Sequence, residues 1–266
     1  MPHTPMIAYA QVRKSFAGSG TDTGVLAVDD VSLEIAAGEF LAIVGGSGSG
    51  KTTLLRLTNR LIEADSGRVT IEGEDVQRLD PVRLRRRIGY VFQSGGLFPH
   101  MSVSRNIGIT PKLEGIPAAE IAARADELLD LVRLDRAQYR DRLPHELSGG
   151  QRQRVSVARA LAARPRIVLM DEPFGALDPL TRDGLGDDYR ALHTKLKLTT
   201  LMITHDMTEA ILLADRVAVM RNGRLLAVGT PAELARSREP YVLELLRTPR
   251  RQAERLSAQL AEGSAA

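Results

Sequence analysis

The segment GGSGSGKTT at residues 45–53 has the residue types and spacing of a phosphate-binding loop. From Gly45 to Thr52 it fits G-x-x-x-x-G-K-[ST], and it stands between an apolar, strand-like run and a helical pattern, as that motif requires. A flexible turn of Gly and Ser is the plainer alternative, and the flanking elements argue against it. In such a loop, backbone N–H groups surround the phosphates, and the lysine reaches the β and γ oxygens. The predicted nucleotide-binding residues are Gly45, Gly46, Ser47, Gly48, Ser49, Gly50, Lys51, Thr52 and Thr53.

Two adjacent carboxylates follow the apolar run of RIVLMDEP at 166–173. A buried parallel strand would deliver Asp171 and Glu172 to the carboxyl edge of a sheet, where ligands bind in open α/β folds. There we predict that Asp171 binds Mg²⁺ together with the Thr52 hydroxyl, and that Glu172 polarises the attacking water as general base. A solvated strand end is the alternative interpretation, which the phosphate loop upstream disfavours.

Two further polar residues follow strand-like runs. His205 comes after LMIT, and its neutral imidazole could bind the γ-phosphate and orient the water. Gln93 closes IGYVF, and its amide could reach Mg²⁺ or the water. Taken alone, each is as easily a surface or capping residue. With the other motifs, the predicted catalytic residues are Glu172, His205 and Lys51, and the predicted metal ligands are Thr52, Gln93 and Asp171.

A second anion site is indicated by HELSGGQRQRVSVARAL at 145–161, in which Ser148, Gly149, Gly150 and Gln151 stand at the start of a helix. A helix start offers unpaired N–H groups and the positive end of the dipole, and Gly lets an oxyanion approach. This segment lies in an insertion that cannot easily fold back over the nucleotide of its own chain. We therefore expect a second copy, head to tail, so that each ATP lies between the Lys51 loop of one chain and the Ser148 helix of the other.

The elements that position these residues can be read from the apolar patterns. A β-rich front (7–16, 25–35 and 39–46), broken by GSGTDTG and AAGE, precedes a helix at 51–62. Strand patterns then vanish between about 94 and 164, where 118–134 carries an apolar helical face. An α/β pattern returns with strands at 166–173 and 198–206 and a hairpin at 215–229 that turns at Asn222-Gly223.

Composition excludes several classes of protein. The 266 residues contain no Cys, so disulfides, thiolate catalysis and Cys-bound metals are excluded. Net charge is only +3, from 36 Lys and Arg against 33 Asp and Glu, so no nucleic-acid partner is predicted. No uncharged apolar run approaches the ~18 residues that span a bilayer, and the start of the chain lacks the apolar stretch of a signal peptide. We therefore expect a soluble, cytosolic protein.

Taken together and in this order, GGSGSGKTT, Gln93, LSGGQ, VLMDEP, ALD and His205 resemble the ATP-binding subunits of ABC transporters, from about Ile7 to Leu246. The resemblance implies an α/β P-loop NTPase fold: a RecA-like core with an antiparallel β subdomain and an inserted helical subdomain. It also implies ATP and Mg²⁺ as ligands. On this basis the ATP-binding domain spans 5–248, with the helical subdomain at about 94–164, and 249–266 is a charged tail that forms a frayed surface helix.

The resemblance adds two residues to the ATP site. Phe16 falls at the aromatic position that stacks on adenine, where Tyr is commoner; a core residue at a strand end is the open alternative. Asp178 belongs to a motif that usually begins with Ser, whereas here GALD begins with Gly175. One hydroxyl contact across the dimer is therefore in doubt, although Asp178 itself is present.

Further residues indicate the kind of transporter. By resemblance, the apolar segment around Gln93–Arg105 receives a short helix of the transmembrane permease subunits; packing of a subdomain hinge is the alternative. NRLIE, GLFPHM and PKL are similar to importer ATPases for glycine betaine, choline and related osmoprotectants, or quaternary amines. That implies an indirect solute-binding protein partner and a peripheral position on the cytoplasmic face of the inner membrane. Relatives often carry a pair of C-terminal CBS domains, which we do not expect here.

Other functions remain open at this stage. An amino-acid or methionine importer, or a lipid-trafficking complex with a similar FQSG segment, would use the same chemistry. A soluble ABC ATPase acting on DNA or ribosomes would need a long coiled-coil insertion or a second cassette, and the sequence contains neither. A nucleotide-binding regulator would be expected to lack Glu172 or His205, and both are present.

Overall fold

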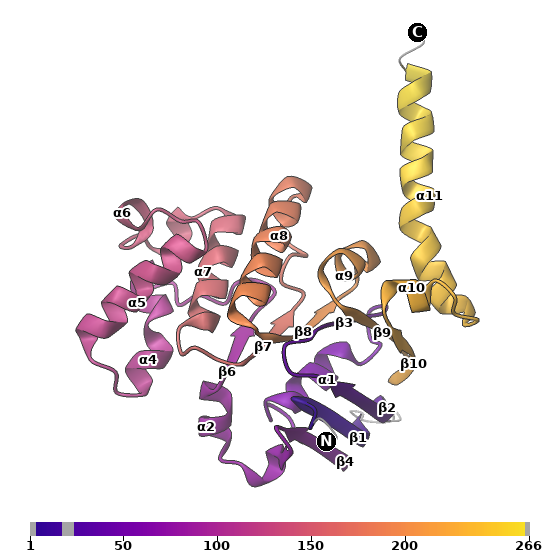
Figure 1. Cartoon of the computed structure of the whole chain (residues 1–266), viewed down its shortest axis with the longest axis horizontal. Coiled ribbons are helices and arrows are strands. Elements are labelled where there is room, and N and C mark those ends of the chain that lie inside the picture. Colours follow the sequence, from indigo (N-terminus) through magenta and orange to yellow (C-terminus); the bar gives the residue numbers. More distant parts are fainter. Residues whose placement is uncertain (1–3, 18–23, 264–266) are drawn as a thin grey trace.

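The computed structural model describes residues 4–17 and 24–263. Most of the predicted GSGTDTG break and the last three residues of the predicted tail lie outside these ranges. Two sheets and a group of helices make up the fold (Figure 1). This arrangement confirms the predicted fold class.

The smaller sheet is antiparallel, with strand order β2-β1-β4-β5. Its strands are β1 (Ile7–Phe16), β2 (Val25–Ile35), β4 (Ser66–Ile71) and β5 (Glu74–Asp75). The predicted strands at 7–16 and 25–35 are confirmed to the residue.

The larger sheet has the order β10-β9-β3-β8-β7-β6 and is parallel except for β10. Its strands are β3 (Phe40–Val44), β6 (Ile88–Val91), β7 (Ile167–Asp171), β8 (Thr199–Thr204), β9 (Arg216–Arg221) and β10 (Arg224–Gly229). Asn222 and Gly223 both have positive φ, 49° and 79°, as a two-residue hairpin turn requires, so the predicted hairpin is confirmed.

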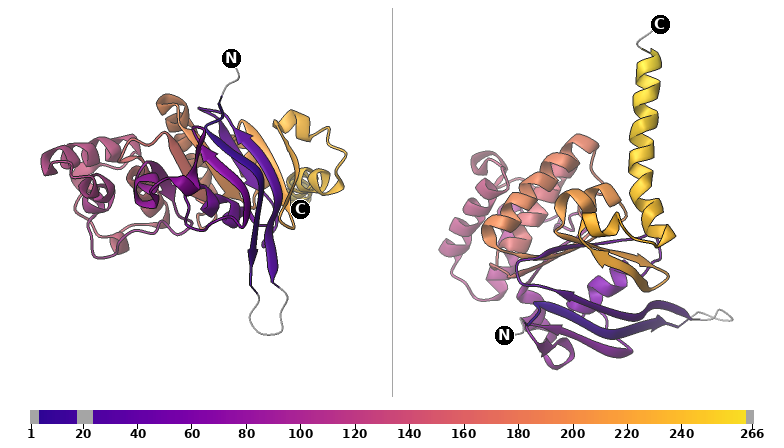
Figure 2. Two further views of the ribbon diagram at one scale, coloured as in Figure 1. Left: turned by 90° about the horizontal axis from the view of Figure 1, so that it is seen from below. Right: turned by 45° about the vertical axis from the view of Figure 1, so that its right-hand side comes forward.

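Both faces of the larger sheet are buried, because alternate side chains of its strands point into two different apolar cores. In β3, Leu41 and Ile43 join the core shared with the antiparallel sheet, whereas Phe40 and Val44 join the core beneath the helices. Figures 1 and 2 show α1 and the antiparallel strands on one side of this sheet and α8 and α9 on the other.

Helices dominate the chain between β6 and β7 and gather at one end of the molecule (Figure 1). They are α3 (Val103–Ile107), α4 (Ile109–Leu113), α5 (Ala118–Leu131), α6 (Arg136–Tyr139) and α7 (Gly149–Leu161), with a 3₁₀ turn at Pro144–Glu146. The face of α5 that packs inward carries Ala125, Leu128 and Leu129, which confirms the apolar helical face predicted within 118–134.

The other helices surround the core sheet. They are α1 (Lys51–Thr58), α2 (Pro81–Arg86), α8 (Pro179–Leu196), α9 (Met207–Leu213), α10 (Pro231–Leu234) and α11 (Pro240–Gly263), with a 3₁₀ turn at Val76–Arg78. The prediction of a helix over 51–62 was too long: α1 ends at Thr58, and Arg60 adopts a positive φ of 55°. Arg60 is held there because its guanidinium donates to the Leu79 carbonyl. No helix in the described part of the chain is long and apolar enough to cross a membrane.

Candidate active site

The phosphate loop connects β3 to α1 and is pressed against two neighbouring strands. Gly50, the N-cap of α1, has φ 99°, and a Cβ atom there would lie 2.0 Å from the Ala27 carbonyl oxygen. A Cβ atom on Gly45 would lie 2.1 Å from the Met220 carbonyl oxygen. Only glycine fits at either position, so the loop's backbone conformation is fixed by its surroundings.

Lys51 lies buried beneath this loop. Its ammonium donates hydrogen bonds to the carbonyl oxygens of Gly45 (2.7 Å) and Gly46 (2.9 Å) and to Oγ of Ser49 (3.3 Å). Burial lowers the pKa of Lys51, and the negative charges of Glu172 and Asp171 act in the opposite direction. The lysine is thus held by the loop and faces the two carboxylates.

Asp171 ends β7 between two parallel strands, which brings it to the sheet edge where the phosphate loop also begins. The Tyr90 hydroxyl donates to Asp171 Oδ2 at 3.3 Å. Burial raises the pKa of Asp171, whereas hydrogen bonds from Tyr90 and, more weakly, Thr52 act in the opposite direction. The predicted metal ligands Thr52 and Asp171 therefore lie beside one another.

Glu172 receives two polar side chains on one oxygen atom. Gln93 Nε2 donates to Glu172 Oε2 at 3.1 Å, and the Nδ1–H tautomer of His205 donates to the same oxygen at 3.2 Å. The structure thus brings together three residues that the sequence separates by 79 and 33 positions. The side chain of Glu172 is 21% exposed and that of His205 59%, so water can reach both.

The backbone of Glu172 is strained. Its φ of 45° lies in the left-handed region, which costs an L-residue free energy of ~1–3 kcal/mol. The conformation is maintained because the Glu172 N–H donates to the Ile203 carbonyl of β8 at 2.9 Å. This strain turns the carboxylate out of the β7 strand direction toward Gln93 and His205.

The segment Ser148–Gln151 lies at the start of α7, in the helical region. Ser148 Oγ caps the helix by accepting from the Gln151 N–H (3.3 Å), and Gln151 Oε1 accepts from the Ser148 N–H (2.9 Å). A Cβ atom on Gly150 would lie 2.4 Å from Thr181 of α8, so the helix start packs closely against the start of α8. Among the described residues, no hydrogen bond or ion pair joins 148–151 to the phosphate loop of the same chain.

Asp178 is the exposed N-cap of α8, and its carboxylate accepts from the Thr181 N–H at 3.0 Å. The hydrogen bonds from Thr181 lower the pKa of Asp178. Gly175 has room for a side chain, since a Cβ atom there would be 3.7 Å from His205 and 3.8 Å from the Glu172 carboxylate. A serine would therefore fit at this position, so steric hindrance does not explain its absence from the motif.

Phe16 ends β1, immediately before the segment 18–23 that the structure does not describe. Its side chain is 43% exposed, and the Lys14 ammonium lies 5.7 Å from the ring centroid. The alternative of a strand-end core residue is therefore wrong, because the ring is accessible to a stacking partner.

The sequence model of a known family, described as "ABC transporter", matches residues 28–175, which is more than half of the chain. The chain belongs to the ABC transporter family. A glycine betaine uptake system ATP-binding protein of Escherichia coli is 46% identical over 85% of this chain and 71% of that protein. A glycine betaine/carnitine/choline transport ATP-binding protein of Bacillus subtilis is 51% identical over 87% of this chain, which spans 60% of that relative's length.

A solved structure of similar fold is the dimeric, post-hydrolysis state of the ATP-binding cassette MJ0796 bound to ADP and Pi. It aligns with a TM-score of 0.76 and 31% identity over 85% of this chain and 98% of that one. The likeness extends the family assignment beyond residue 175 to most of the ABC cassette.

Sequence reasoning missed the residues of this ABC cassette that hold the segment after Gln93. Arg159, buried in α7, donates to the carbonyl oxygens of Gly96 (2.6 Å) and Gly95 (2.8 Å), and Gln153 Nε2 donates to the Phe92 carbonyl (3.3 Å). Burial lowers the pKa of Arg159 to about 10. The helix that begins at Ser148 therefore also anchors the loop that carries Gln93. The sequence feature that could have indicated these residues is a polar side chain on the buried face of a helix.

Beyond this loop, the buried Asn106 fixes the next turn. Its amide donates to the carbonyls of Phe98, Met101 and Ser102, at 3.0–3.1 Å, and its Oδ1 accepts from the Phe98 N–H at 2.7 Å. Phe98 remains 41% exposed, and its ring lies 6.2 Å from the ring of His100, which lines a cavity of about 720 Å³. The cavity is lined by apolar side chains and by His100, Arg105, Lys112 and Arg140, with no acidic residue.

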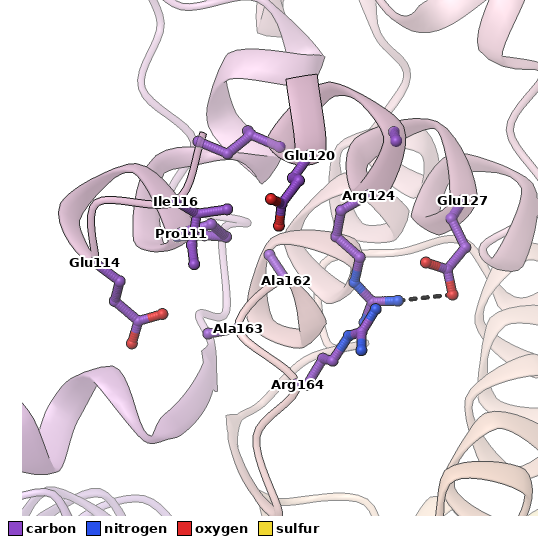
Figure 3. A pocket seen from close by; sticks show the side chains of 11 residues that line it. Pro111, Glu114, Ile116, Glu120, Arg124, Glu127, Ala162, Ala163 and Arg164 are labelled. Atoms are coloured by element: carbon purple, nitrogen blue, oxygen red, sulfur yellow. Dashed lines mark ion pairs between the residues drawn. The ribbon is translucent and has the colours of Figure 1, made fainter. Parts of the chain in front are cut away.

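Figure 3 shows a different pocket in the helical region, which is lined by none of the predicted site residues. It has a volume of about 470 Å³ and lies between α4, α5 and the end of α7. Arg124 crosses it, bonded to Glu127 (2.8 Å) and to the Leu161 carbonyl (2.9 Å). These bonds engage the two terminal nitrogens of Arg124 and tie it to the end of α7, whereas its buried Nε has no hydrogen-bond partner among the described residues.

Proposed function

We propose that this chain is the ATP-hydrolysing subunit of a bacterial ABC importer for quaternary-ammonium osmoprotectants such as glycine betaine and choline. The observation that carries the enzymatic part is the pair of hydrogen bonds from Gln93 and His205 to one oxygen of Glu172, beside Lys51. The solute class is supported by the relatives, whose names include glycine betaine, carnitine and choline transport.

In the proposed reaction, Glu172 accepts a proton from a water molecule as the water oxygen attacks the γ-phosphorus. The bond between the γ-phosphorus and the β,γ-bridging oxygen breaks, leaving ADP and inorganic phosphate. A doubly protonated His205 would donate its Nδ1–H to the Glu172 carboxylate and its Nε2–H to the γ-phosphate, while Gln93 orients the water. Lys51 stabilises the β and γ oxygens, and Phe16 stacks on adenine.

The oxygen donors at this sheet edge suit Mg²⁺, which favours oxygen ligands and is commonly held by one or two carboxylates together with phosphates. Thr52 and Asp171 lie together, and the raised pKa of the half-buried Asp171 indicates a carboxylate that would gain from a neighbouring cation. Thr52, Asp171 and Gln93 would hold the ion, which when bound neutralises charge on the phosphate oxygens. In the described ranges no three His, Asp or Glu side chains form a metal cluster, so these donors act together with the substrate.

We further propose that two copies complete each ATP site. The helix start is exposed at Ser148 and Gly149 and has no bond to its own phosphate loop among the described residues. A partner chain placed head to tail would bring that helix start to the γ-phosphate. The dimeric solved cassette of similar fold supports this arrangement.

The permease would dock on the surface around Gln93–Arg105. The cavity lined by His100 combines apolar walls with Arg105 and Lys112, while Arg140 is paired with Asp126, so it suits a short permease helix with apolar residues and a carboxylate. Through the permease, the chain would lie at the cytoplasmic face of the inner membrane and serve a solute-binding protein without contacting it. No role with nucleic acid is proposed.

Reconstitution in liposomes tests this proposal. The chain would be purified with the membrane subunits and binding protein encoded beside it, and ATP-driven uptake of labelled glycine betaine, choline and methionine would be compared. We expect uptake of the two quaternary amines and none of methionine, and no uptake with Lys51→Ala. Uptake of methionine alone would contradict the solute assignment, and ATP-independent uptake would contradict the enzymatic one.

A further inference from the structure

The long C-terminal helix α11 touches the phosphate loop. Most of α11 extends away from the body of the molecule (Figures 1 and 2), but its first turns are anchored. Val242 is fully buried, and Leu245 and Leu246 pack on the core beneath the helices. Between these anchors and the loop stands Tyr241, whose hydroxyl accepts a hydrogen bond from the Gly46 N–H at 3.2 Å.

This hydrogen bond and a bond of Lys51 use the two ends of one peptide group. The Gly46 N–H and the Gly45 carbonyl belong to the same peptide plane, and that carbonyl accepts from the Lys51 ammonium at 2.7 Å. The three groups form a chain from ammonium to peptide to phenol hydroxyl. Hydrogen bonds linked through one peptide polarise and strengthen one another, and together they oppose rotation of the peptide plane.

Tyr241 is itself held in place. The guanidinium of Arg221, at the end of β9, lies 4.6 Å from the centroid of the Tyr241 ring. α11 also packs against α9, the helix that begins two residues after His205. The base of α11 therefore contacts the loop that holds Lys51 and the helix that follows His205.

We infer that Tyr241 is a positioning residue for Lys51: by fixing the Gly45–Gly46 peptide, it holds the carbonyl that orients the ammonium toward the phosphates. The inference rests on the nucleotide-binding role proposed above. It assigns to the C-terminal helix a direct part in nucleotide affinity that none of the sequence motifs indicates. If Tyr241 served only to pack α11, its ring would matter and its hydroxyl would not. Removing the hydroxyl alone therefore separates the packing role from the positioning role.

The test compares Tyr241→Phe, which removes only the hydroxyl, with the wild-type chain in calorimetric titration with ADP. A neutral hydrogen bond is worth a factor of about 2–10 in affinity, so we expect ADP to bind about 2- to 10-fold more weakly. Arg221→Met is the matched control, because it removes the cation over the ring and keeps the hydroxyl. It should change affinity by less than Tyr241→Phe.

A double-mutant cycle decides whether the effect passes through the peptide. Gly46→Pro removes the N–H donor, so adding Tyr241→Phe to it should have no further effect. Gly46→Ala keeps the N–H, and its Cβ atom would be 3.6 Å from the Tyr241 hydroxyl, an ordinary contact. In that background the full effect of Tyr241→Phe should return, which shows that a substitution at residue 46 does not by itself abolish the effect.

Equal affinity of wild-type protein and Tyr241→Phe for ADP would overturn the inference, as would an equal loss in the Pro and wild-type backgrounds. Failure of the wild-type chain to bind ADP or ATP at all would instead overturn the proposed function. The two failures are therefore distinguishable in one set of titrations.

Discussion

The phosphate-loop edge of the sheet and the start of α7 both suit anions, but they are built differently. At the sheet edge, Lys51, Asp171 and Glu172 are joined to Tyr90, Gln93 and His205 by hydrogen bonds or close charges. At the start of α7, Ser148 and Gln151 bond only to each other and to their own helical region. The first region is an interconnected site, and the second is a helix start, exposed at Ser148 and Gly149, that is not bonded to that site among the described residues.

The sheet-edge residues and the start of α7, which we propose act in one reaction, therefore lie on two separate surfaces of the chain. The sheet edge collects its residues through strand order, because parallel strands end at the same edge. The α7 start is carried by an insertion and packs on α8 instead. Substitutions in the two regions should therefore have different consequences for a single chain.

The largest effect is expected for Glu172→Gln. Loss of a general base should lower hydrolysis by about 10²–10⁴-fold, while ATP binding through Lys51 and the phosphate loop is kept. The variant should consequently persist as an ATP-bound dimer on a sizing column. Unchanged turnover would show that Glu172 is not the general base. It would also contradict the distinction drawn between the two regions.

A smaller effect is expected for Lys51→Ala on nucleotide binding by the single chain. Loss of a charge-assisted contact of ~1.5–3 kcal/mol corresponds to about 10- to 100-fold weaker binding. Ser148→Asn is the contrasting variant, since Asn caps a helix as well as Ser does but presents a bulkier amide. It should leave binding by a dilute single chain unchanged and lower hydrolysis at concentrations that allow dimers; weakened single-chain binding would place Ser148 in its own chain's site.

The smallest effect is expected for Asp171→Asn on stability. Because burial raises the pKa of Asp171, the folded chain favours its protonated form, so the ionised carboxylate costs stability at neutral pH. The Asn variant should unfold with a free energy higher by about 0.5–2 kcal/mol at pH 7.5, while losing Mg²⁺-dependent hydrolysis.

The pH dependence provides the check. As the pH falls through the raised pKa toward the ordinary Asp value of 3.8, the carboxylate becomes neutral and the advantage of Asn disappears. Urea titrations at pH 7.5 and pH 4 should therefore show a smaller difference at the lower pH. If the difference in unfolding free energy between the Asn variant and the wild type grows in acid, the predicted direction of the effect is contradicted.

Sequence patterns predicted the strands and the fold class well, because period-two and period-3.6 apolar patterns follow directly from burial. Helix α1 was predicted too long because local apolar spacing could not reveal the hydrogen bond from the Arg60 guanidinium to the Leu79 carbonyl. For the site, spacing within motifs indicated residue types and a shared sheet edge. It could not indicate the left-handed backbone of Glu172 or the contacts of Arg159, Asn106 and Tyr241, which depend on partners distant in the chain.

We propose that one chain carries two half-sites, each of which acts only with the complementary half-site of a second copy. It is tested most directly by mixing a Lys51→Ala chain with a Ser148→Arg chain, each inactive alone, and measuring ATP hydrolysis. Equal mixing makes half of the dimers mixed, each with one intact site of two, so about a quarter of the wild-type rate should return. A Lys51→Ala chain mixed with the Lys51→Ala, Ser148→Arg double variant is the control and should stay inactive. Full inactivity of the first mixture, with dimers present, would contradict the claim.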